Sequence, residues 1–487
     1  MGTDLTRTIS AVKGESRKHG YNAEEIRVTS LLDYVDHRYP LENSPVESRY
    51  NSHILACNSL RSDTKRSDIL SLLVANYIRS VRQDSQEGRH RGIVYIVNQL
   101  KKPEEVACLK SIYGDALLVI SCHSPHETRV KSLTDKIALD HGSPASQDKW
   151  NQLATELIDK DESEKDKYGQ NVRAAFPLAD CIIDTQSKEE TINGVSRLFR
   201  LIFGDPSLSP LYPEYGNNLA AQAALRSTDL SRQVGAAIFD GRKTVISLGS
   251  NEVPKPTGGT YWPGDDGDGR DVSAGFDINT IKKRELVIDV VQRLQNNGIL
   301  KKDWDDKSHE ELLAELIDGE QEVLSNARIL DILEYGRALH AEMNAITDAA
   351  RCNKSTQDAT VFVTTFPCHN CAKHIVGAGI KEVFYLEPYP KSEVASLYPD
   401  SICIDPIPKS EGGKVIFRQF CGITTNKFQL FSKYKLKDKR GMLKPWDPEV
   451  ANCLLRNNPA DFARSEDIYI DQIEGALASG KLTLLER

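Results

Sequence analysis

The sequence lacks the long apolar runs, the dense cysteines and the excess of basic residues that each mark a class of protein. It has no stretch of about 18 apolar residues, so we expect no transmembrane helix and no membrane partner. Ten cysteines in 487 residues are too sparse for a disulfide scaffold, and the first residues lack the basic-then-apolar pattern of a secretory signal. We therefore expect a cytoplasmic protein with reduced thiols.

Acidic residues also outnumber basic residues, with 70 Asp and Glu against 62 Lys and Arg. The formal net charge is −8 at pH 7, and aromatic residues make up 7% of the chain. A protein that coats nucleic acid needs excess Lys and Arg to displace counterions from phosphates, so we expect no nucleic-acid polymer as a partner. Because 487 residues exceed one ordinary domain of roughly 100–200 residues, the chain should fold as several domains.

The N-terminal part of the chain alternates between patterns of helix and strand. Helices are predicted at 6–18 and 103–112, and strands at 26–32, 93–97 and 116–120. This βαβ spacing predicts a domain at 1–205 built on a doubly wound parallel sheet. A stretch rich in Pro, Ser and Gly at 204–213 marks its end.

A second α/β domain is predicted at 214–440, followed by a helical appendage at 441–487. Asp240-Gly241 between two apolar runs indicates a β-hairpin. The later elements are predicted as helices at 340–350 and 371–378 and strands at 360–364 and 382–386. An insertion at about 254–335 interrupts this pattern, and its first part is rich in glycine and aspartate.

The chemistry is concentrated at the starts of two predicted helices. His340-Ala-Glu342 opens one, and Pro367-Cys368-His-Asn-Cys371 opens the other directly after a strand. One imidazole and two thiolates leave the fourth tetrahedral position of a zinc ion for water. Cys368 and Cys371 lie one helical turn apart, so both sulfurs can reach one ion. We predict Zn²⁺ as the cofactor, held by His340, Cys368 and Cys371, with Glu342 close enough to shuttle protons.

Two other readings of the cysteine pair remain. A structural zinc site would need a fourth protein ligand, for which His369 and His374 are the nearest candidates. A redox pair would need a thioredoxin-like domain around it, and the surrounding sequence does not match one. The order His-x-Glu and then Pro-Cys-x-x-Cys is instead the signature of zinc-dependent deaminases.

Residues from about 215 to 435 resemble the cytidine and deoxycytidylate deaminase superfamily. The resemblance rests on the two zinc helices with a strand between them, on Ser231-Arg-Gln-Val-Gly-Ala236 before the hairpin, and on Gly249-Ser-Asn251 after it. It implies an α/β/α sandwich around a five-stranded sheet, and hydrolytic deamination with Glu342 as the proton shuttle. It also implies that Asn251 contacts the ribose; the alternative is an ordinary Asn in a turn.

Further residues are candidates for substrate binding. Lys391 and Ser392 follow a predicted strand near the expected mouth of the site, and Arg232 precedes the hairpin. Each of these three could bind phosphate, or could be an exposed loop residue. Tyr261 and Trp262 belong to the loop of the insertion, which we interpret as a lid that shields the base or packs at a subunit contact. The acidic residues of this loop lack the spacing of a calcium site.

The whole chain resembles a narrower group, the bacterial antiphage deoxycytidine nucleotide deaminases, which carry a nucleotide-kinase-like domain before the deaminase. The resemblance rests on Gly258-Gly-Thr-Tyr-Trp-Pro-Gly264 and on Tyr385-Leu-Glu-Pro-Tyr-Pro-Lys-Ser392. It implies conversion of dCTP or dCMP to deoxyuridine nucleotides plus ammonia, which would deplete the dCTP pool during infection. Members of the superfamily commonly complete their sites across subunits, so we expect a homo-oligomer.

The kinase-like domain departs from its pattern at the phosphate loop. Gly-x-x-x-x-Gly-Lys-Ser/Thr should precede the first helix, but Met1-Gly-Thr-Asp4 stands there. The first strand and half of the loop would lie before Met1, so the phosphate loop is degenerate or truncated. Without its Lys we expect no phosphoryl transfer. The domain is then a sensor, regulator or assembly platform, or else a scaffold.

Three hypotheses of function follow. The leading one is a zinc hydrolase that acts on deoxycytidine nucleotides, either in antiphage depletion of dCTP or as a housekeeping dCMP deaminase. A polynucleotide-editing deaminase would share the metal chemistry, but it needs a basic groove and stacking aromatic residues. A nucleotide-sensing protein with a structural zinc would not need Glu342.

Overall fold

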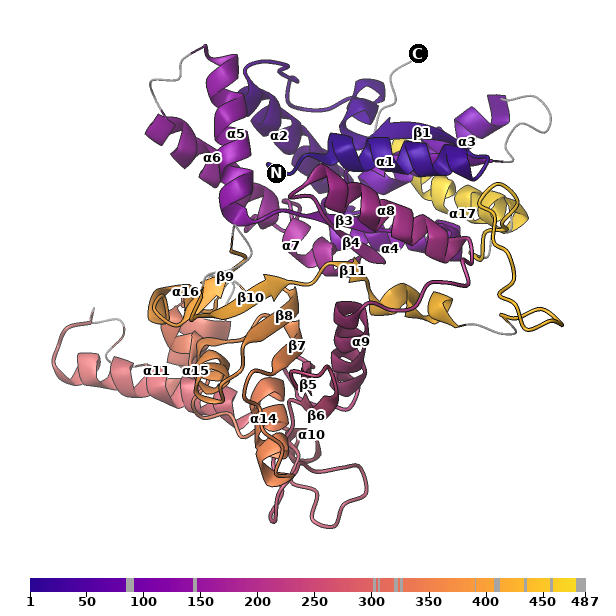
Figure 1. The fold of residues 1–487 in the computed structure, drawn as a ribbon. Helices are drawn as coiled ribbons and strands as arrows, with labels where there is room; N and C mark the ends of the chain where they lie inside the picture. Colours follow the sequence, from indigo (N-terminus) through magenta and orange to yellow (C-terminus); the bar gives the residue numbers. More distant parts are fainter. Residues whose placement is uncertain are drawn as a thin grey trace. The chain divides into compact units, whose positions relative to one another are not determined.

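The computed structural model divides the chain into two compact units (Figure 1). The first consists of Met1–Glu214 together with Cys421–Arg487, and the second is Tyr215–Phe420. The residues that the structure describes are 1–84, 92–142, 147–300, 304, 307–318, 323–324, 327–389, 391–406, 412–432, 436–455 and 459–478. The sequence pattern places the end of the second domain at 440, whereas the structure returns the chain to the first unit after Phe420.

The first unit is a mixed α/β structure. Its strands are β1 (Asn22–Arg27), β2 (Ile93–Asn98), β3 (Ile120–His123), β4 (Cys181–Asp184) and β11 (Gly422–Ile423). Its helices are α1 (Leu5–Lys18), α2 (Val46–Thr64), α3 (Ile69–Asp84), α4 (Pro103–Tyr113), α5 (His126–Asp140), α6 (Gln147–Glu162), α7 (Val172–Ala175), α8 (Lys188–Ile202) and α17 (Pro459–Ala478). In the described part of the chain, every helix is too short or too polar to cross a membrane.

The strands of the first unit form two small sheets rather than the single doubly wound sheet that we expected. β1 and β2 pair in parallel, and so do β3 and β4, while β11 joins β4 antiparallel. β4 is an inner strand, and Cys181, Ile182 and Ile183 are each 1% exposed. No residue of β2 or β3 is buried, although β2 is mostly apolar. The sheet is interrupted because no described strand joins β2 to β3.

The start of the chain leads directly into α1, the helix that would follow a phosphate loop. Asp4 caps α1, since its carboxylate accepts a hydrogen bond from the Thr6 backbone N–H at 3.0 Å. A helix N-terminus is a ready anion site, and here the chain's own carboxylate occupies it. Thr3 and Asp4 therefore give α1 a different N-terminus from the Lys-Ser/Thr of a phosphate loop.

The second unit is built on a six-stranded sheet of order β6-β5-β7-β8-β10-β9. Its strands are β5 (Gly235–Phe239), β6 (Val245–Ser250), β7 (Thr360–Thr365), β8 (Glu382–Glu387), β9 (Ile402–Ile404) and β10 (Val415–Gln419). β5 and β6 form the expected hairpin, β5 pairs antiparallel with β7, and the strands from β7 to β9 are parallel. The sheet thus has one more strand than the resemblance implied.

Helices cover both faces of this sheet. Its helices are α9 (Tyr212–Ala224), which begins at the end of the first unit, α10 (Asp271–Ala274), α11 (Ile278–Asn296), α13 (His309–Leu313), α14 (Ala341–Arg351), α15 (His369–Gly377) and α16 (Val394–Leu397). On one face, α14 and α15 pack their small and apolar side chains against Val361 and Val363 of β7. On the other, α9 lies so close that a Cβ on Gly216 would be 2.3 Å from the Phe362 ring. The insertion has a small core of its own around Val287 and Leu312.

Candidate metal centre

Two helix N-termini hold the predicted metal ligands. His340 is the N-cap of α14 and Cys368 is the N-cap of α15, both in extended backbone conformation. Cys371 lies in the first turn of α15 and is fully buried. Extended N-cap residues let the side chain turn back over the helix end, and the helix dipole favours thiolate over thiol there. The local sequence thus places one imidazole and two sulfurs at the ends of two packed helices.

The three ligand atoms lie within 4.8 Å of one another, the one such group of metal-ligating side chains among the described residues. His340 Nδ1 is 3.3 Å from both the Cys368 and Cys371 Sγ atoms. Zinc–sulfur bonds of about 2.3 Å and zinc–nitrogen bonds of about 2.0 Å at tetrahedral angles separate S and N by roughly 3.5 Å. The side chains therefore fit Zn²⁺ with little movement, and three ligands leave one position open.

Glu342 adds a buried carboxylate to this group. The residue is 4% exposed, and its Oε2 lies 3.4 Å from Cys371 Sγ. Burial raises the pKa of Glu342 to about 7. The hydrogen bonds from Cys371 and His340 lower the pKa of Cys368 to about 4. The bond to Cys368 raises the pKa of His340 to about 9. These pKa shifts describe a Cys368 thiolate paired with a protonated His340, from which Zn²⁺ would displace the proton on binding.

Residues 213–387 match the family model of the cytidine and deoxycytidylate deaminase zinc-binding region. This region contains His340, Glu342, Cys368 and Cys371. The match covers the β5–β6 hairpin, the insertion and both ligand helices, and it ends with β8. The donor set and the family match agree on zinc as the bound metal.

Individual relatives share shorter segments. The chain is 49% identical over 55 residues to the deoxycytidylate deaminase of Enterobacteria phage T2, which is 11% of this chain and 29% of that protein. It is 47% identical over 53 residues to ComE operon protein 2 of Bacillus subtilis (strain 168), which is 11% of this chain and 28% of that protein. The chain thus spans less than a third of the length of these two relatives.

A solved structure also aligns with the chain. It is the dCMP deaminase of the cyanophage S-TIM5 in its apo form, matched over 43% of this chain and 99% of its own. The identity is 16% and the TM-score is 0.23, a level of similarity that supports no conclusion about function.

Asn251 lies within the region that matches the family model, and its side chain is engaged within the protein. It is 7% exposed, its Oδ1 accepts from the Val234 N–H at 2.7 Å, and its Nδ2 donates to the Arg232 carbonyl at 2.6 Å. The next residue, Glu252, pairs with Leu339 directly before the His340 ligand. Asn251 therefore holds the segment before β5 near the start of α14.

The three candidate phosphate ligands differ in their surroundings. Lys391 forms an ion pair with Asp331 at 2.5 Å, and the Ser392 hydroxyl donates to the Pro367 carbonyl at 2.8 Å, next to Cys368. Arg232 is exposed, and its guanidinium lies 6.0 Å from the centre of the Tyr389 ring. Its charge acts on the Glu387 carboxylate and lowers the pKa of that group. Of the three, Arg232 is the one whose charge is available to a phosphate.

Tyr261 and Trp262 contact Arg226, a residue that precedes the β5–β6 hairpin. The Arg226 guanidinium lies 3.8 Å from the centre of the Trp262 ring, and its Nη2 donates to the Tyr261 carbonyl at 3.1 Å. Trp262 remains 54% exposed. The structure thus places Trp262 on the surface and does not bring it together with the zinc ligands.

Sequence reasoning missed two residues that follow β8 or end it. The Tyr389 carbonyl accepts from the backbone N–H of Ser392, whose hydroxyl bonds to Pro367 next to Cys368, and burial raises the pKa of the Tyr389 phenol. Burial also raises the pKa of Glu387, while Arg232 lowers it. Ligands of α/β sheets bind beyond the carboxyl ends of parallel strands. That rule could have selected Glu387 and Tyr389 from the predicted end of the strand.

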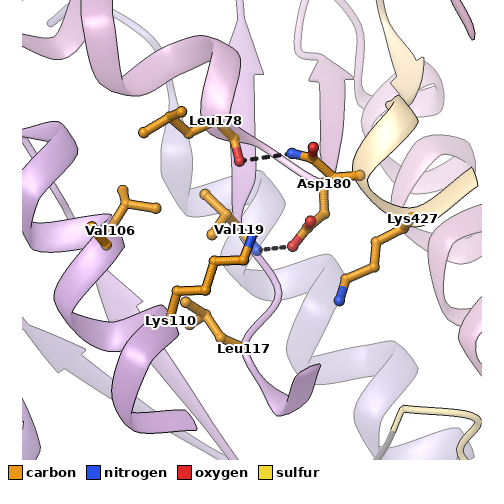
Figure 2. Close-up of a pocket in the computed structure, with 9 residues that line it drawn as sticks. Val106, Lys110, Leu117, Val119, Leu178, Asp180 and Lys427 are labelled. Atoms are coloured by element: carbon orange, nitrogen blue, oxygen red, sulfur yellow. Dashed lines mark hydrogen bonds between the residues drawn. The ribbon is translucent and has the colours of Figure 1, made fainter. Parts of the chain in front are cut away.

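A small hollow in the first unit is a poor candidate for a second site (Figure 2). It measures about 190 Å³ and is lined by Val106, Leu117 and other side chains of α4 and its neighbours. The Asp180 carboxylate turns back to accept from the Val119 N–H at 2.9 Å. Small-molecule pockets are typically about 300–1,000 Å³, so this hollow is too small for a nucleotide.

Proposed function

We propose that the second unit removes the amino group of cytosine from deoxycytidine nucleotides and yields deoxyuridine nucleotides and ammonia. The observation that carries this proposal is the three-ligand cluster with the buried Glu342 carboxylate 3.4 Å from Cys371 Sγ. A structural zinc would need a fourth protein ligand, and the described residues supply three. The name of the T2 relative, a deoxycytidylate deaminase, supports a nucleotide substrate.

The residues of the site have two roles in the reaction, metal binding and proton transfer. His340, Cys368 and Cys371 would hold Zn²⁺, which supplies a water activated near neutral pH when it is bound. Glu342 accepts a proton from the water that attacks C4 of cytosine, and it delivers protons to N3 and to the leaving amino group. A C4–O bond forms, the C4–N bond breaks, and ammonia leaves.

Substrate recognition rests on residues around the ligand cluster. We propose that Arg232 binds the 5′ phosphates and that Asn251 helps to position the ribose through the segment before β5. The Tyr389 ring lies 6.0 Å from the Arg232 guanidinium and packs against the core of the second unit, so Tyr389 is our candidate to contact the base. The roles of Lys391 and Ser392 would be to hold the loop after β8, because both are already engaged.

Ammonia release from a panel of substrates tests the reaction and separates the alternatives. The panel consists of dCMP, dCTP, cytidine, adenosine and a single-stranded oligonucleotide, with the Glu342→Gln variant as a blank. We expect turnover of dCMP or dCTP at least about tenfold above that of cytidine, because phosphate contacts contribute to binding. Turnover confined to the oligonucleotide would favour a polynucleotide editor, and nucleotide binding without turnover would favour a sensor.

We further propose that dCTP is a substrate in the cell and that its depletion serves antiphage defence, with a housekeeping dCMP deaminase as the alternative. The support is the resemblance of the whole chain to antiphage deoxycytidine nucleotide deaminases. Nucleotide pools measured during phage infection decide between them. We expect dCTP to fall in cells with the wild-type protein and to persist with Glu342→Gln. Equal pools in both strains would favour the housekeeping role.

We also propose a homo-oligomer, because sites in this superfamily are commonly completed across subunits. Light scattering coupled to size-exclusion chromatography should give a mass that is a multiple of 54.3 kDa. A single species of 54.3 kDa would contradict the proposal.

A further inference from the structure

The polar side chains that follow β6 are engaged within the protein. The amide of Asn251 is bonded to the backbone of the segment before β5. Glu252 is 2% exposed; its Oε2 accepts from the Thr228 N–H at 3.1 Å and hydroxyl at 2.8 Å, and its Oε1 from the Val253 N–H at 2.9 Å. Breaking such buried hydrogen bonds is costly. The sugar of a bound nucleotide therefore needs a partner from another strand.

Glu387 ends β8 on the face of the sheet that carries the ligand helices. In the parallel register of β7 and β8, Thr365 pairs with Glu387, and Val363 pairs with Tyr385. Side chains alternate between the two faces of a sheet, and Val363 and Tyr385 belong to the core that contains α14 and α15 side chains. The Glu387 side chain therefore lies on that same face, at the carboxyl end of the strand.

A backbone contact joins the end of β8 to the segment that leads into the metal ligands. The Glu387 carbonyl accepts from the Phe366 N–H at 2.7 Å, and Cys368, the N-cap of α15, follows two residues later. Neighbouring strands lie about 4.8 Å apart, so Glu387 is one strand away from this segment. Ligands of α/β sheets bind beyond the carboxyl ends of parallel strands. Glu387 thus borders the proposed substrate site.

Arg232 is the charged group that acts on Glu387. Its guanidinium lies 6.0 Å from the centre of the Tyr389 ring, and Tyr389 follows Glu387 by two residues. Burial raises the pKa of Glu387 and Arg232 lowers it, and within the described part of the chain no hydrogen bond to the carboxylate contributes. An ionised carboxylate can only accept hydrogen bonds. The Glu387 carboxylate is therefore open to a donor on a ligand.

We propose that Glu387 determines specificity for the sugar by accepting a hydrogen bond from the 3′-hydroxyl of the nucleotide. This inference rests on the proposed function. The sugar of a 2′-deoxynucleoside 5′-phosphate has a single free hydroxyl, at the 3′ position, so this is the sugar donor that a carboxylate can bind. With the base at the metal ligands and the 5′ phosphate on Arg232, the sugar lies between them. A hydrogen bond to a charged acceptor is roughly twice as strong as a neutral one, so a substrate without this hydroxyl should bind less well.

Two nucleotides that differ only in this hydroxyl test the proposal, dCMP and 2′,3′-dideoxycytidine 5′-monophosphate. For the zinc-loaded wild type, we expect kcat/KM from ammonia release and affinity from calorimetry to be roughly 10- to 100-fold higher for dCMP. Glu387→Ala should bring both ratios to within about twofold of unity, mainly through weaker binding of dCMP. Glu387→Gln keeps a neutral acceptor and should give intermediate ratios. If Glu387→Ala does not fold, the ratios of Glu387→Gln decide the test.

Glu382→Gln is the matched control. Glu382 is the other acidic residue of β8; it lies at the amino end of the strand and pairs with Arg418 at 2.6 Å. Its variant should keep the wild-type ratios. Wild-type ratios in both Glu387 variants would overturn the proposal. An equal loss for the two nucleotides would also overturn it, because Glu387 would then only orient Arg232 or contact the base.

The affinity ratio separates this proposal from the proposed function. A wild-type protein that binds both nucleotides without turnover would refute deamination, and the effect of Glu387→Ala on the affinity ratio would still show whether Glu387 binds the 3′-hydroxyl. A protein that binds neither nucleotide would overturn both proposals.

Discussion

At the scale of single residues, the candidate site brings together buried side chains whose ionised forms would each be unfavourable alone. A buried carboxylate and two buried sulfurs lie around one imidazole, and each would be costly to ionise in isolation. A dication removes that cost for the sulfurs. Glu342 is then the one group of the cluster that can carry protons, so a change at Glu342 tests the proposed reaction most directly.

Glu342→Gln should keep the shape of the side chain and remove its ability to transfer protons. We expect zinc content and nucleotide affinity to stay near wild type. Deamination should fall by about 10²–10⁴-fold or more, because one carboxylate serves several transfers. Plasma emission, calorimetry and ammonia release on one preparation measure the three quantities. Glu285→Gln, at an exposed carboxylate of α11, is the matched control. Activity within tenfold of wild type would contradict the role of Glu342.

Asp161 provides a test of the first unit through pH. Burial alone would raise the pKa of Asp161, but the charges of Lys101 and the Met1 amine outweigh it and lower the pKa from 3.8 to about 2. The unfolded carboxyl binds its proton at the higher pH. The stability contributed by Asp161 is therefore complete above about pH 4 and is lost as the pH falls towards about 2.

For the polypeptide of residues 1–487, Asp161→Asn should lower the free energy of unfolding of the first unit by about 2 kcal/mol at pH 7. The loss should shrink near pH 3. Urea unfolding at the two pH values measures it. Asp159→Asn, at an exposed position on the same helix, should change the free energy of unfolding by less than about 0.5 kcal/mol. An Asp161→Asn effect that is the same at both pH values would refute the ion-pair explanation.

At the scale of secondary-structure elements, the site depends on how closely α14 packs on β6. A Cβ at Gly249 would lie 2.1 Å from the Ala341 carbonyl and 2.6 Å from the Ala345 N–H. Both atoms belong to the backbone of α14 and cannot rotate away. The absence of a side chain on β6 thus sets the position of the helix that begins beside the His340 ligand.

Gly249→Ala should displace α14 and separate His340 from the two cysteines. We expect a destabilisation of about 1–3 kcal/mol, as for other overpacked positions, together with weaker zinc binding. Gly241→Ala is the matched control, because a Cβ there meets nothing within 4 Å. Thermal unfolding and competition with a zinc chelator measure the two effects. A Gly249→Ala protein with wild-type zinc affinity would show that α14 is not held by this contact.

The elements also show what the sequence could and could not predict. The helix expected at 340–350 is α14 at Ala341–Arg351, because a helix start and its apolar stripe are local features. The strand expected at 26–32 is wrong: β1 ends at Arg27 and a 3-10 helix follows at Val28–Tyr34. Leu31 and Leu32 are buried there, and a short apolar run does not distinguish a strand from a helical turn.

The same limit applies to the site. His340, Glu342, Cys368 and Cys371 fall in two short motifs, so spacing alone brings their side chains together. Asn251 and Ser392 are candidates for substrate contact, and in the structure both bond to backbone carbonyls, of Arg232 and Pro367 respectively. Such partners are distant in sequence and are set by the fold, so no local pattern indicates them.

At the scale of the whole molecule, the chain forms its zinc-binding region by interrupting another unit. The first unit is completed by residues after Phe420, where β11 pairs with β4 and α17 packs on α3 and α4. The described metal-ligating cluster lies entirely within Tyr215–Phe420. Metal binding should therefore stabilise the two units unequally.

Removal of zinc tests this division. An ion that binds only the folded second unit stabilises it by about 2.7 kcal/mol when its free concentration is 100 times the Kd. Chelation, or Cys371→Ser, should therefore speed hydrogen exchange in α14 and α15, while exchange in α8 and β4 should be unchanged. Cys352→Ser changes an exposed cysteine that does not belong to the cluster, and it should behave as wild type in both units. If α8 and β4 lost as much protection as α14 and α15, the zinc ion would stabilise the chain as one body. The separation of the two units argued here would then be wrong.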